Sequence, residues 1–196
     1  GTLSTATGNI GIGKDVFAAL TSGDYNIAIG YEALDANTSA SNNVAIGQDA
    51  LGANTTGSNN IAIGQAALDV PDTEENNIAI GKDALGGSVA GGEQCVAIGV
   101  QAGQSNTSGD YLAAFGYGAG RDNSTGANNT MIGGYSGYQI TTGSKNTTLG
   151  YSAGSTMTDG EQMTCLGFQA GASITTGTGN TIIGGTSAAA LQDGNN

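Results

Sequence analysis

The amino-acid sequence predicts an all-β fold, a parallel β-solenoid of about eleven 17-residue coils. Three observations carry this prediction: a five-residue tract that returns along the chain, a glycine that ends every copy, and a second glycine column that precedes the first. Glycine supplies 36 of the 196 residues, well above its ordinary share. We expect the whole chain, 1–196, to form a single repeat domain.

The repeat is clearest at 26–30, which reads Asn-Ile-Ala-Ile-Gly and returns nearly unchanged at 43–47, 60–64 and 77–81. We call the final glycine of each copy the anchor. The spacing between anchors is 17 residues, except for one interval of 18 whose extra residue falls between Gly86 and Gln94. The anchors are Gly13, Gly30, Gly47, Gly64, Gly81, Gly99, Gly116, Gly133, Gly150, Gly167 and Gly184.

Each repeat predicts four elements in order: a short strand of β-branched residues before the anchor, a turn, a second short strand of small residues, and a Thr-Gly corner. The residue before each anchor is aliphatic or aromatic, and the third residue after it is Ala or Ser from Gly30 onward. The corner glycines, seven residues before the anchors, are expected to supply positive φ angles. Seventeen residues are too few for a helix and a strand, whereas they suit one coil that pairs in parallel with the next.

The residue four before the anchor is asparagine in most repeats, which predicts an amide ladder between stacked coils. The alternative is that these asparagines serve the turn alone. The ladder residues are Asn9, Asn26, Asn43, Asn60 and Asn77, followed after a break by Asn129, Asn146 and Asn180, with Cys95, Leu112 and Met163 as interruptions.

Strand alternation places Ile27 and Ile29 on one side of the coil and Ala28 on the other. If alanine fills the narrow lumen, the isoleucine columns face outward, and their exposure calls for association along the rod around a shared core. The alternative places isoleucine in the lumen and leaves a monomeric solenoid. Parity alone does not decide between the two.

Composition excludes several classes of function. The formal net charge is −12, which disfavours nucleic acid as a partner. The chain has no histidine, so histidine-based catalysis and the commonest metal ligand are absent, and we predict no enzyme activity and no cofactor. No apolar run reaches the length of a membrane-spanning helix, so we expect no direct membrane insertion.

Two rows of side chains are candidate sites. Asp15, Glu32, Asp49 and Asp83 follow their anchors by two residues and form a solvated acidic face or, less simply, a cation site; we predict no metal site. Aromatic residues could stack on a ligand or pack over a thin core. The candidate ligand-binding surface comprises Tyr111, Tyr117, Tyr135, Tyr138, Tyr151 and Phe168.

The cysteines and the asparagines of Asn-x-Ser/Thr sequences are explained by structure without a disulfide or glycosylation. Cys95 and Cys165 lie four coils apart, too far for an intrachain disulfide, and both are expected to be buried. Asn-x-Ser/Thr sequences coincide with a turn column, so turn chemistry explains them without glycosylation. These sequences begin, for instance, at Asn37, Asn54, Asn106 and Asn123.

The repeats resemble the head repeats of trimeric autotransporter adhesins, the YadA-like head family, and also repeats of phage tail-fibre-like proteins. Residues 55–67 carry the resemblance, reading Thr-Thr-Gly-Ser-Asn-Asn-Ile-Ala-Ile-Gly-Gln-Ala-Ala, and related repeats cover nearly the whole chain. The resemblance implies a left-handed β-roll, a homotrimer packed side by side or intertwined, and an extracellular location on a cell or virion surface. It also implies adhesion, with a host-surface glycan or protein as ligand.

The chain departs from a uniform repeat at its middle. The fourth residue after the anchor is leucine for the anchors Gly30 to Gly81 and glycine for Gly99 to Gly167, so we distinguish an Ala-Leu segment, 1–90, from an Ala-Gly segment, 91–196. A threonine column also begins there, which suggests an ice-binding solenoid as the alternative function. A polysaccharide-degrading spike is a weaker alternative. The threonines are Thr130, Thr147, Thr164 and Thr181.

Overall fold

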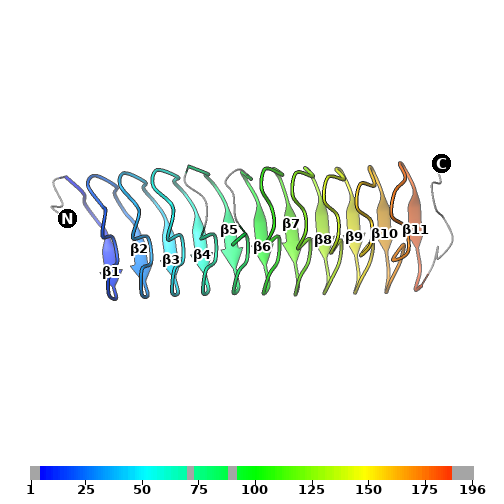
Figure 1. Ribbon diagram of the computed structural model, residues 1–196, viewed down its shortest axis with the longest axis horizontal. Helices are drawn as coiled ribbons and strands as arrows, with labels where there is room; N and C mark the ends of the chain where they lie inside the picture. The colour runs from blue at the N-terminus through cyan, green and yellow to red at the C-terminus, as the bar shows by residue number, and fades with distance from the viewer. Residues whose placement is uncertain (1–4, 70–72, 88–91, 187–196) are drawn as a thin grey trace.

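The computed structural model describes residues 5–69, 73–87 and 92–186, which form an elongated rod of stacked coils (Figure 1). Its eleven three-residue strands lie in one parallel sheet in chain order. This arrangement confirms the predicted parallel β-solenoid. The strands are β1 (Ile10–Ile12), β2 (Ile27–Ile29), β3 (Val44–Ile46), β4 (Ile61–Ile63), β5 (Ile78–Ile80), β6 (Val96–Ile98), β7 (Ala113–Phe115), β8 (Thr130–Ile132), β9 (Thr147–Leu149), β10 (Thr164–Leu166) and β11 (Thr181–Ile183).

Equivalent residues of successive coils pair across the sheet. Ile61 of β4 stands opposite Val44 of β3 and Ile78 of β5, and the same register holds along the rod. At roughly 4.8 Å per coil, eleven coils span on the order of 50 Å. Ile78 still pairs with Val96 across the 18-residue interval. Of the stretch expected to hold the extra residue, 88–91 lie outside the described residues.

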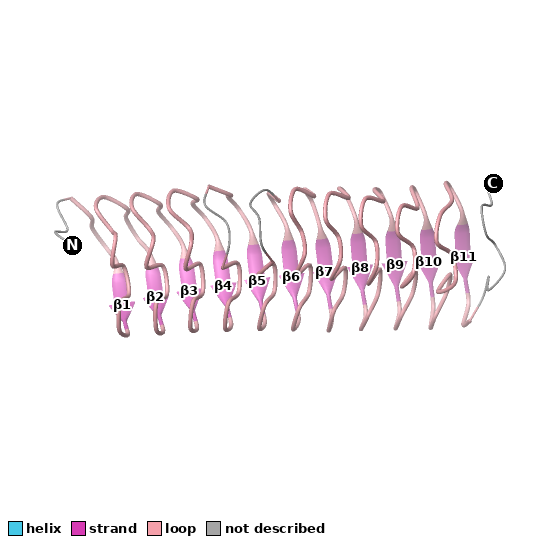
Figure 2. Ribbon diagram, in the orientation of Figure 1, coloured by secondary structure: helices cyan, strands magenta, loops and turns pink. Residues whose placement is uncertain are grey.

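One predicted element is wrong: within the described residues, each coil has one strand and no second strand of small residues (Figure 2). The cause is a regular reversal of backbone conformation after the anchor. The second residue after every anchor has φ between 47° and 59°, and the fourth has φ between 48° and 63° in the ten coils from Gly13 to Gly167. Two left-handed residues so close together prevent an extended strand. The segment nonetheless bonds to its neighbouring coils, as when Asp49 N–H donates to Tyr31 O and Leu51 N–H to Ala67 O.

The anchor glycines are required by both backbone conformation and close approach. All eleven have φ between 120° and 143°, a region that side-chain-bearing residues rarely adopt. A Cβ atom at Gly64 would lie 2.5 Å from the carbonyl oxygen of Gly81 in the next coil. The same contact recurs at each anchor from Gly13 to Gly167, so the coils stack too closely for any side chain at this position.

The corner glycines serve a different purpose from the one predicted. Most of them do not have positive φ, so the expectation that they supply such angles is wrong. Most of them are needed instead because a carbonyl oxygen of the next coil lies where a Cβ would stand, at 2.1 Å for Gly23 and 2.2 Å for Gly57. Glycine at these corners again reflects the close contact between coils.

Alanine fills the lumen and the larger aliphatic side chains face outward. Ala28, Ala45, Ala62 and Ala79, at the centres of β2 to β5, are fully buried. The residues on either side of them in each strand are partly exposed. The structure therefore decides the parity question in favour of isoleucine outside.

The change from the Ala-Leu to the Ala-Gly segment is a change in how the lumen is filled. In the first segment leucines such as Leu34 and Leu51 occupy the left-handed position after the anchor and are fully buried. In the second segment glycine takes this position, and side chains from other positions fill the space that leucine occupies in the first segment. A Cβ at Gly137 would lie 2.6 Å from the Met131 sulfur and 3.1 Å from Ile140 Cδ1. Left-handed leucine is costly, and glycine removes that cost.

The predicted amide ladder is confirmed. Asn60 N–H donates to Asn43 Oδ1 at 2.8 Å, and Asn77 N–H donates in turn to Asn60 Oδ1 at 2.9 Å. The Asn60 side-chain amide donates to Glu74 O at 2.8 Å, which ties the strand of one coil to the corner of the next. Cys95 N–H continues the series by donating to Asn77 Oδ1.

Replacing an anchor should destabilise the rod strongly. We expect Gly64→Ala to lower the free energy of unfolding by at least about 2 kcal/mol, because the methyl group meets the Gly81 carbonyl and φ is unfavourable. Chemical denaturation followed by circular dichroism measures the change. Gly134→Ala is the matched control, since its Cβ would make only ordinary contacts, 3.5 Å from the Tyr151 ring. Equal stability of the two variants would contradict the close-approach argument.

Interrupting the amide ladder should also be costly. Asn60→Ala leaves the buried Asn77 N–H and the Glu74 carbonyl without their partners, so we expect a loss of about 2 to 4 kcal/mol in the free energy of unfolding. Gln65→Ala, an exposed flank position, should change it by less than about 0.5 kcal/mol. A small effect of Asn60→Ala in the same denaturation assay would argue for a turn role alone.

Candidate functional site

Five of the six candidate aromatic residues form one continuous surface, which we call the aromatic strip. It consists of Tyr117, Tyr135, Tyr138, Tyr151 and Phe168, and it runs along one flank of the coils that contain β7 to β10. Tyr117, Tyr151 and Phe168 directly follow their anchors, so the 17-residue repeat sets them in one column. The strand ends immediately before the anchor, and the rings therefore lie at its carboxyl end.

The rings of the strip contact one another in series. Tyr135 is the centre, with its ring centroid 5.2 Å from that of Tyr117, 5.3 Å from Tyr138 and 5.9 Å from Tyr151, all at edge-to-face angles. The Tyr151 and Phe168 rings stack at 5.6 Å with an interplanar angle of 13°. Half of the surface of Tyr117 (50%), Tyr151 (49%) and Phe168 (55%) stays exposed. Burial raises the pKa of Tyr135, and its electrostatic interaction and hydrogen bond with Tyr117 add to the rise, so the Tyr135 hydroxyl is protonated at neutral pH.

Sequence analysis did not single out two further members of this site, Arg121 and Asp122. The Arg121 guanidinium lies over the Tyr138 ring, with Cζ 3.9 Å from the ring centroid, and donates to the Tyr138 hydroxyl. It also donates to both Asp122 oxygens, from Nε at 2.7 Å and from Nη2 at 2.8 Å. The available signal was the spacing of 17 residues between Arg121 and Tyr138, which puts one directly beside the other in successive coils.

The structure does not bring Tyr111 to the strip. Tyr111 precedes β7 and Tyr117 follows it, so the two tyrosines flank opposite ends of the same strand. No ring contact joins Tyr111 to the other five within 5–69, 73–87 and 92–186. Its side chain is 53% exposed as a separate surface group.

The acidic row, Asp15, Glu32, Asp49 and Asp83, lies in the first half of the rod, two residues after the anchors of its coils. Asp15 pairs with Lys14, whose Nζ is 2.9 Å from the Asp15 carboxylate and 5.2 Å from the centroid of the Tyr31 ring. Asp49 accepts a hydrogen bond from the Gln48 side chain at 3.0 Å. Within the described part of the chain, no three acidic or cysteine side chains are grouped as metal ligands.

Two further carboxylates, Asp35 and Asp69, each follow their anchor by five residues. Asp35 and Asp69 stand on either side of Gly52, and their Oδ1 atoms would lie 3.5 Å and 2.7 Å from a Cβ on that glycine. Burial raises the pKa of both carboxyls. Repulsion from Glu32 and Asp49 adds to the shift of Asp35, and repulsion from Asp49 and Asp35 adds to that of Asp69. Ionisation of this pair therefore opposes folding.

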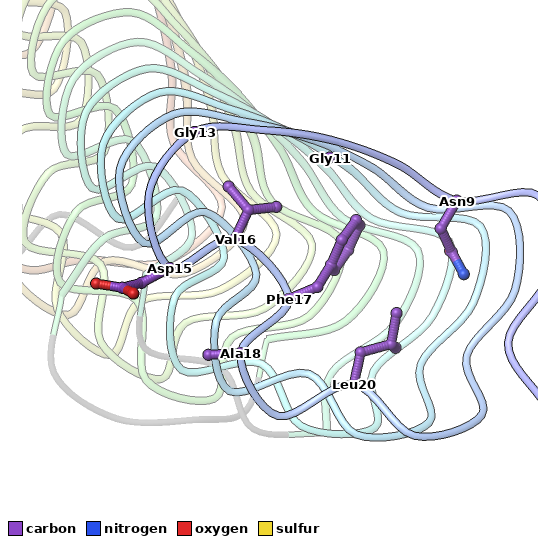
Figure 3. Close-up of a pocket in the computed structure, with 8 residues that line it drawn as sticks. All are labelled: Asn9, Gly11, Gly13, Asp15, Val16, Phe17, Ala18 and Leu20. Atoms are coloured by element: carbon purple, nitrogen blue, oxygen red, sulfur yellow. The ribbon is translucent and has the colours of Figure 1, made fainter. Parts of the chain in front are cut away.

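An open cavity of about 580 Å³ marks the N-terminal coil (Figure 3). Val16 and Phe17 point into this coil, while Asp15 points out of it. Gly11 takes the place of the usual lumen alanine, because a Cβ there would lie 3.0 Å from Val16 and 3.1 Å from Phe17. The cavity is the mouth of the lumen beside β1, where the apolar Val16, Phe17 and Leu20 share the lining with the polar Asn9 and Asp15.

The outer side of the sheet is a second extensive surface, which we call the apolar sheet face. It is made of the first and third residues of β1 to β11, and none of these residues is charged. They are aliphatic in β1 to β6, whereas Thr130, Thr147, Thr164 and Thr181 occupy the first position in the last four strands. The face is most exposed at its ends, where Ile12 is 60% and Ile183 is 67% exposed.

The predictions for cysteines are confirmed, and the sequon asparagines have structural roles. Cys95 and Cys165 are both buried and both free, and burial raises the pKa of each thiol to about 11. Asn37 and Asn106 are buried, and each accepts a bond from the backbone N–H three residues ahead. This geometry favours the turn explanation for these asparagines.

Searches of protein-family models, curated proteins and solved structures return no match for this chain. In 5–69, 73–87 and 92–186 there is also no helix with the length and apolar character needed to cross a membrane.

Neutralising Asp69 should change how stability depends on pH. The folded-state pKa is raised, so the folded chain binds more protons than the unfolded chain between the two pKa values, and the free energy of unfolding falls as pH rises through that interval. We expect Asp69→Asn to reduce this fall and to be at least as stable as the parent chain at pH 7. Denaturation at several pH values from 3 to 7 measures the effect. At pH 3, where the parent carboxyl is protonated, the two proteins should converge; a less stable variant at pH 7 would contradict the argument.

Proposed function

We propose that this chain is a structural and adhesive segment of an extracellular trimeric fibre, either a bacterial adhesin head or a phage tail-fibre-like shaft. In this proposal the solenoid acts as a stiff spacer that displays a recognition surface on its flank. No reaction is part of the proposed function. The proposal rests on one observation, the uncharged apolar sheet face that extends over all eleven strands.

A face of this kind favours association along the rod. Exposed apolar side chains on a soluble chain are usually scattered, whereas here the column of third strand residues is apolar in all eleven coils. The column of first residues is apolar from β1 to β7 and threonine from β8 to β11. The lumen is already filled by Ala28 and its equivalents, so the outward aliphatic side chains have no partner of their own in the single solenoid core. Packing these faces around a common axis would remove them from water.

The number of chains and the location come from the sequence resemblance. Repeats similar to residues 55–67 belong to trimeric heads and to fibres on cell or virion surfaces, which favours three chains and an extracellular setting. A thin rod with two buried, unbridged cysteines would depend on coil stacking and association for its stability.

The ice-binding alternative has one supporting observation. Thr130, Thr147, Thr164 and Thr181 pair in register across β8 to β11, so their side chains form a regular column. The adjacent column of the same strands is aliphatic, with Ile132 and Leu149 as examples. A single threonine column beside an apolar one favours association over ice binding.

The mass of the purified chain in solution tests the proposal. We expect light scattering to give a mass near three times 19.1 kDa. Ile63 belongs to the apolar sheet face, so Ile63→Glu would bury an unpaired charge between subunits that associate through this face. We therefore expect this variant to be a monomer that keeps its solenoid circular dichroism. Gln65→Glu carries the same new charge on the exposed flank and should keep the parent mass. A monodisperse monomer for the parent chain would overturn the trimeric fibre.

A further inference from the structure

The aromatic strip is not needed to close the core beneath it. The lumen of these coils is filled by other side chains, among them Ala119, Ser136, Ala153 and Ala170, all fully buried, and no ring of the strip packs against this core among the described residues. The rings lie outside this layer, where they contact one another and solvent. Their mutual contacts hold them in place, so a ligand that stacks on them loses little side-chain freedom in the protein.

The strip has an opening in its column of rings. Gly134 occupies the position that holds Tyr117 in the preceding coil and Tyr151 in the following one. A Cβ at Gly134 would meet the Tyr151 ring at 3.5 Å, so the space between the two tyrosines is open to a small group. Tyr135, from the next column, lies edge-on to both tyrosines beside this opening.

Polar groups adjoin the apolar ring faces. Arg121 uses three of its five N–H groups, on Asp122 and Tyr138, among the residues that the structure describes. Its two remaining N–H groups and the Tyr151 hydroxyl can bond to hydroxyl groups of a ligand. The Tyr138 hydroxyl already accepts from Arg121, and the Tyr117 and Tyr135 hydroxyls interact with each other. The guanidinium is held in place from two sides, by the Asp122 carboxylate and by the Tyr138 ring.

Charge disfavours an anionic ligand. Asp122 balances the charge of Arg121, and the other members of the strip are uncharged tyrosine and phenylalanine. The chain as a whole carries a net charge of −12, which repels anions. Nucleic acid bases also stack on aromatic rings, but their phosphates need a basic groove, which this flank lacks.

From this geometry we infer that the aromatic strip binds neutral glycans, with pyranose rings stacked along Tyr117, Tyr151 and Phe168 and sugar hydroxyls bonded to Arg121 and the Tyr151 hydroxyl. A pyranose ring presents an apolar C–H face bordered by hydroxyl groups, which matches ring faces bordered by polar donors. The stacked column runs along the rod, so a linear chain of several sugars fits better than a single sugar. The inference deepens the proposed function by naming the ligand class of the adhesive flank.

Calorimetric titration of the full chain with cellohexaose and chitohexaose tests the inference. We expect at least one of these neutral oligosaccharides to bind and to perturb the tyrosine fluorescence of this tryptophan-free protein. We expect no comparable binding of polygalacturonate or of single-stranded oligothymidylate, because both are anionic. Failure of both neutral probes to bind, or preferential binding of either anion, would overturn the inference.

Variants locate the bound sugar. Tyr151→Ala should weaken binding about tenfold or more, because it removes the ring at the middle of the stack. Tyr31→Ala is the matched control, since Tyr31 also directly follows its anchor but lies in the first half of the rod, outside the strip. Tyr111→Ala should likewise leave binding unchanged. Equal losses in Tyr151→Ala and Tyr31→Ala would contradict binding at the strip.

Light scattering of the same samples separates this inference from the trimeric fibre. Binding that Tyr151→Ala abolishes in a chain that proves monomeric supports the glycan site and rejects the trimer. A trimer that binds neither oligosaccharide does the reverse. If Tyr151→Ala changes the mass of the assembly, the strip is a contact between subunits and the glycan site is rejected.

Discussion

The whole structure depends on how closely one coil lies against the next. At each anchor from Gly13 to Gly167 the carbonyl of the following coil occupies the space that a Cβ would need, and the same holds for most of the corner glycines. This spacing aligns the backbone hydrogen bonds, the asparagine ladder and the side-chain columns. The aromatic strip exists because a residue type repeated at 17-residue intervals is brought into contact with its equivalents.

The two halves of the rod meet the same packing requirement with different residues. Near Leu51 the backbone adopts a left-handed conformation that leucine disfavours, and the buried side chain compensates by filling the lumen. Near Gly137 the backbone is relaxed, and Met131 and Ile140 fill the lumen from other positions. A narrow lumen therefore needs a constant volume of side chain per coil more than it needs a particular residue at each position.

The repeat was sufficient to predict the solenoid, the strand positions and the asparagine ladder, because each depends only on spacing. It did not predict the turn that replaces the second strand, since residues as different as Asp49, Leu51 and Tyr135 adopt left-handed conformations there. Closeness in sequence grouped Tyr111 with the strip, although its place in the repeat separates it. The sequence did not point to Arg121, because the residue type at its position varies from repeat to repeat. Its pairing with Tyr138 follows only when successive repeats are aligned.

Because each strand bonds only to its immediate neighbours, the rod has a particular response to tension along its axis. A coil pulled away from an end exposes 17 residues, which extend to roughly 56 Å in place of the roughly 4.8 Å that the coil occupied. Loosening one coil leaves the contacts of the others intact. The molecule can thus lengthen stepwise under load, taking up mechanical work without losing its remaining structure.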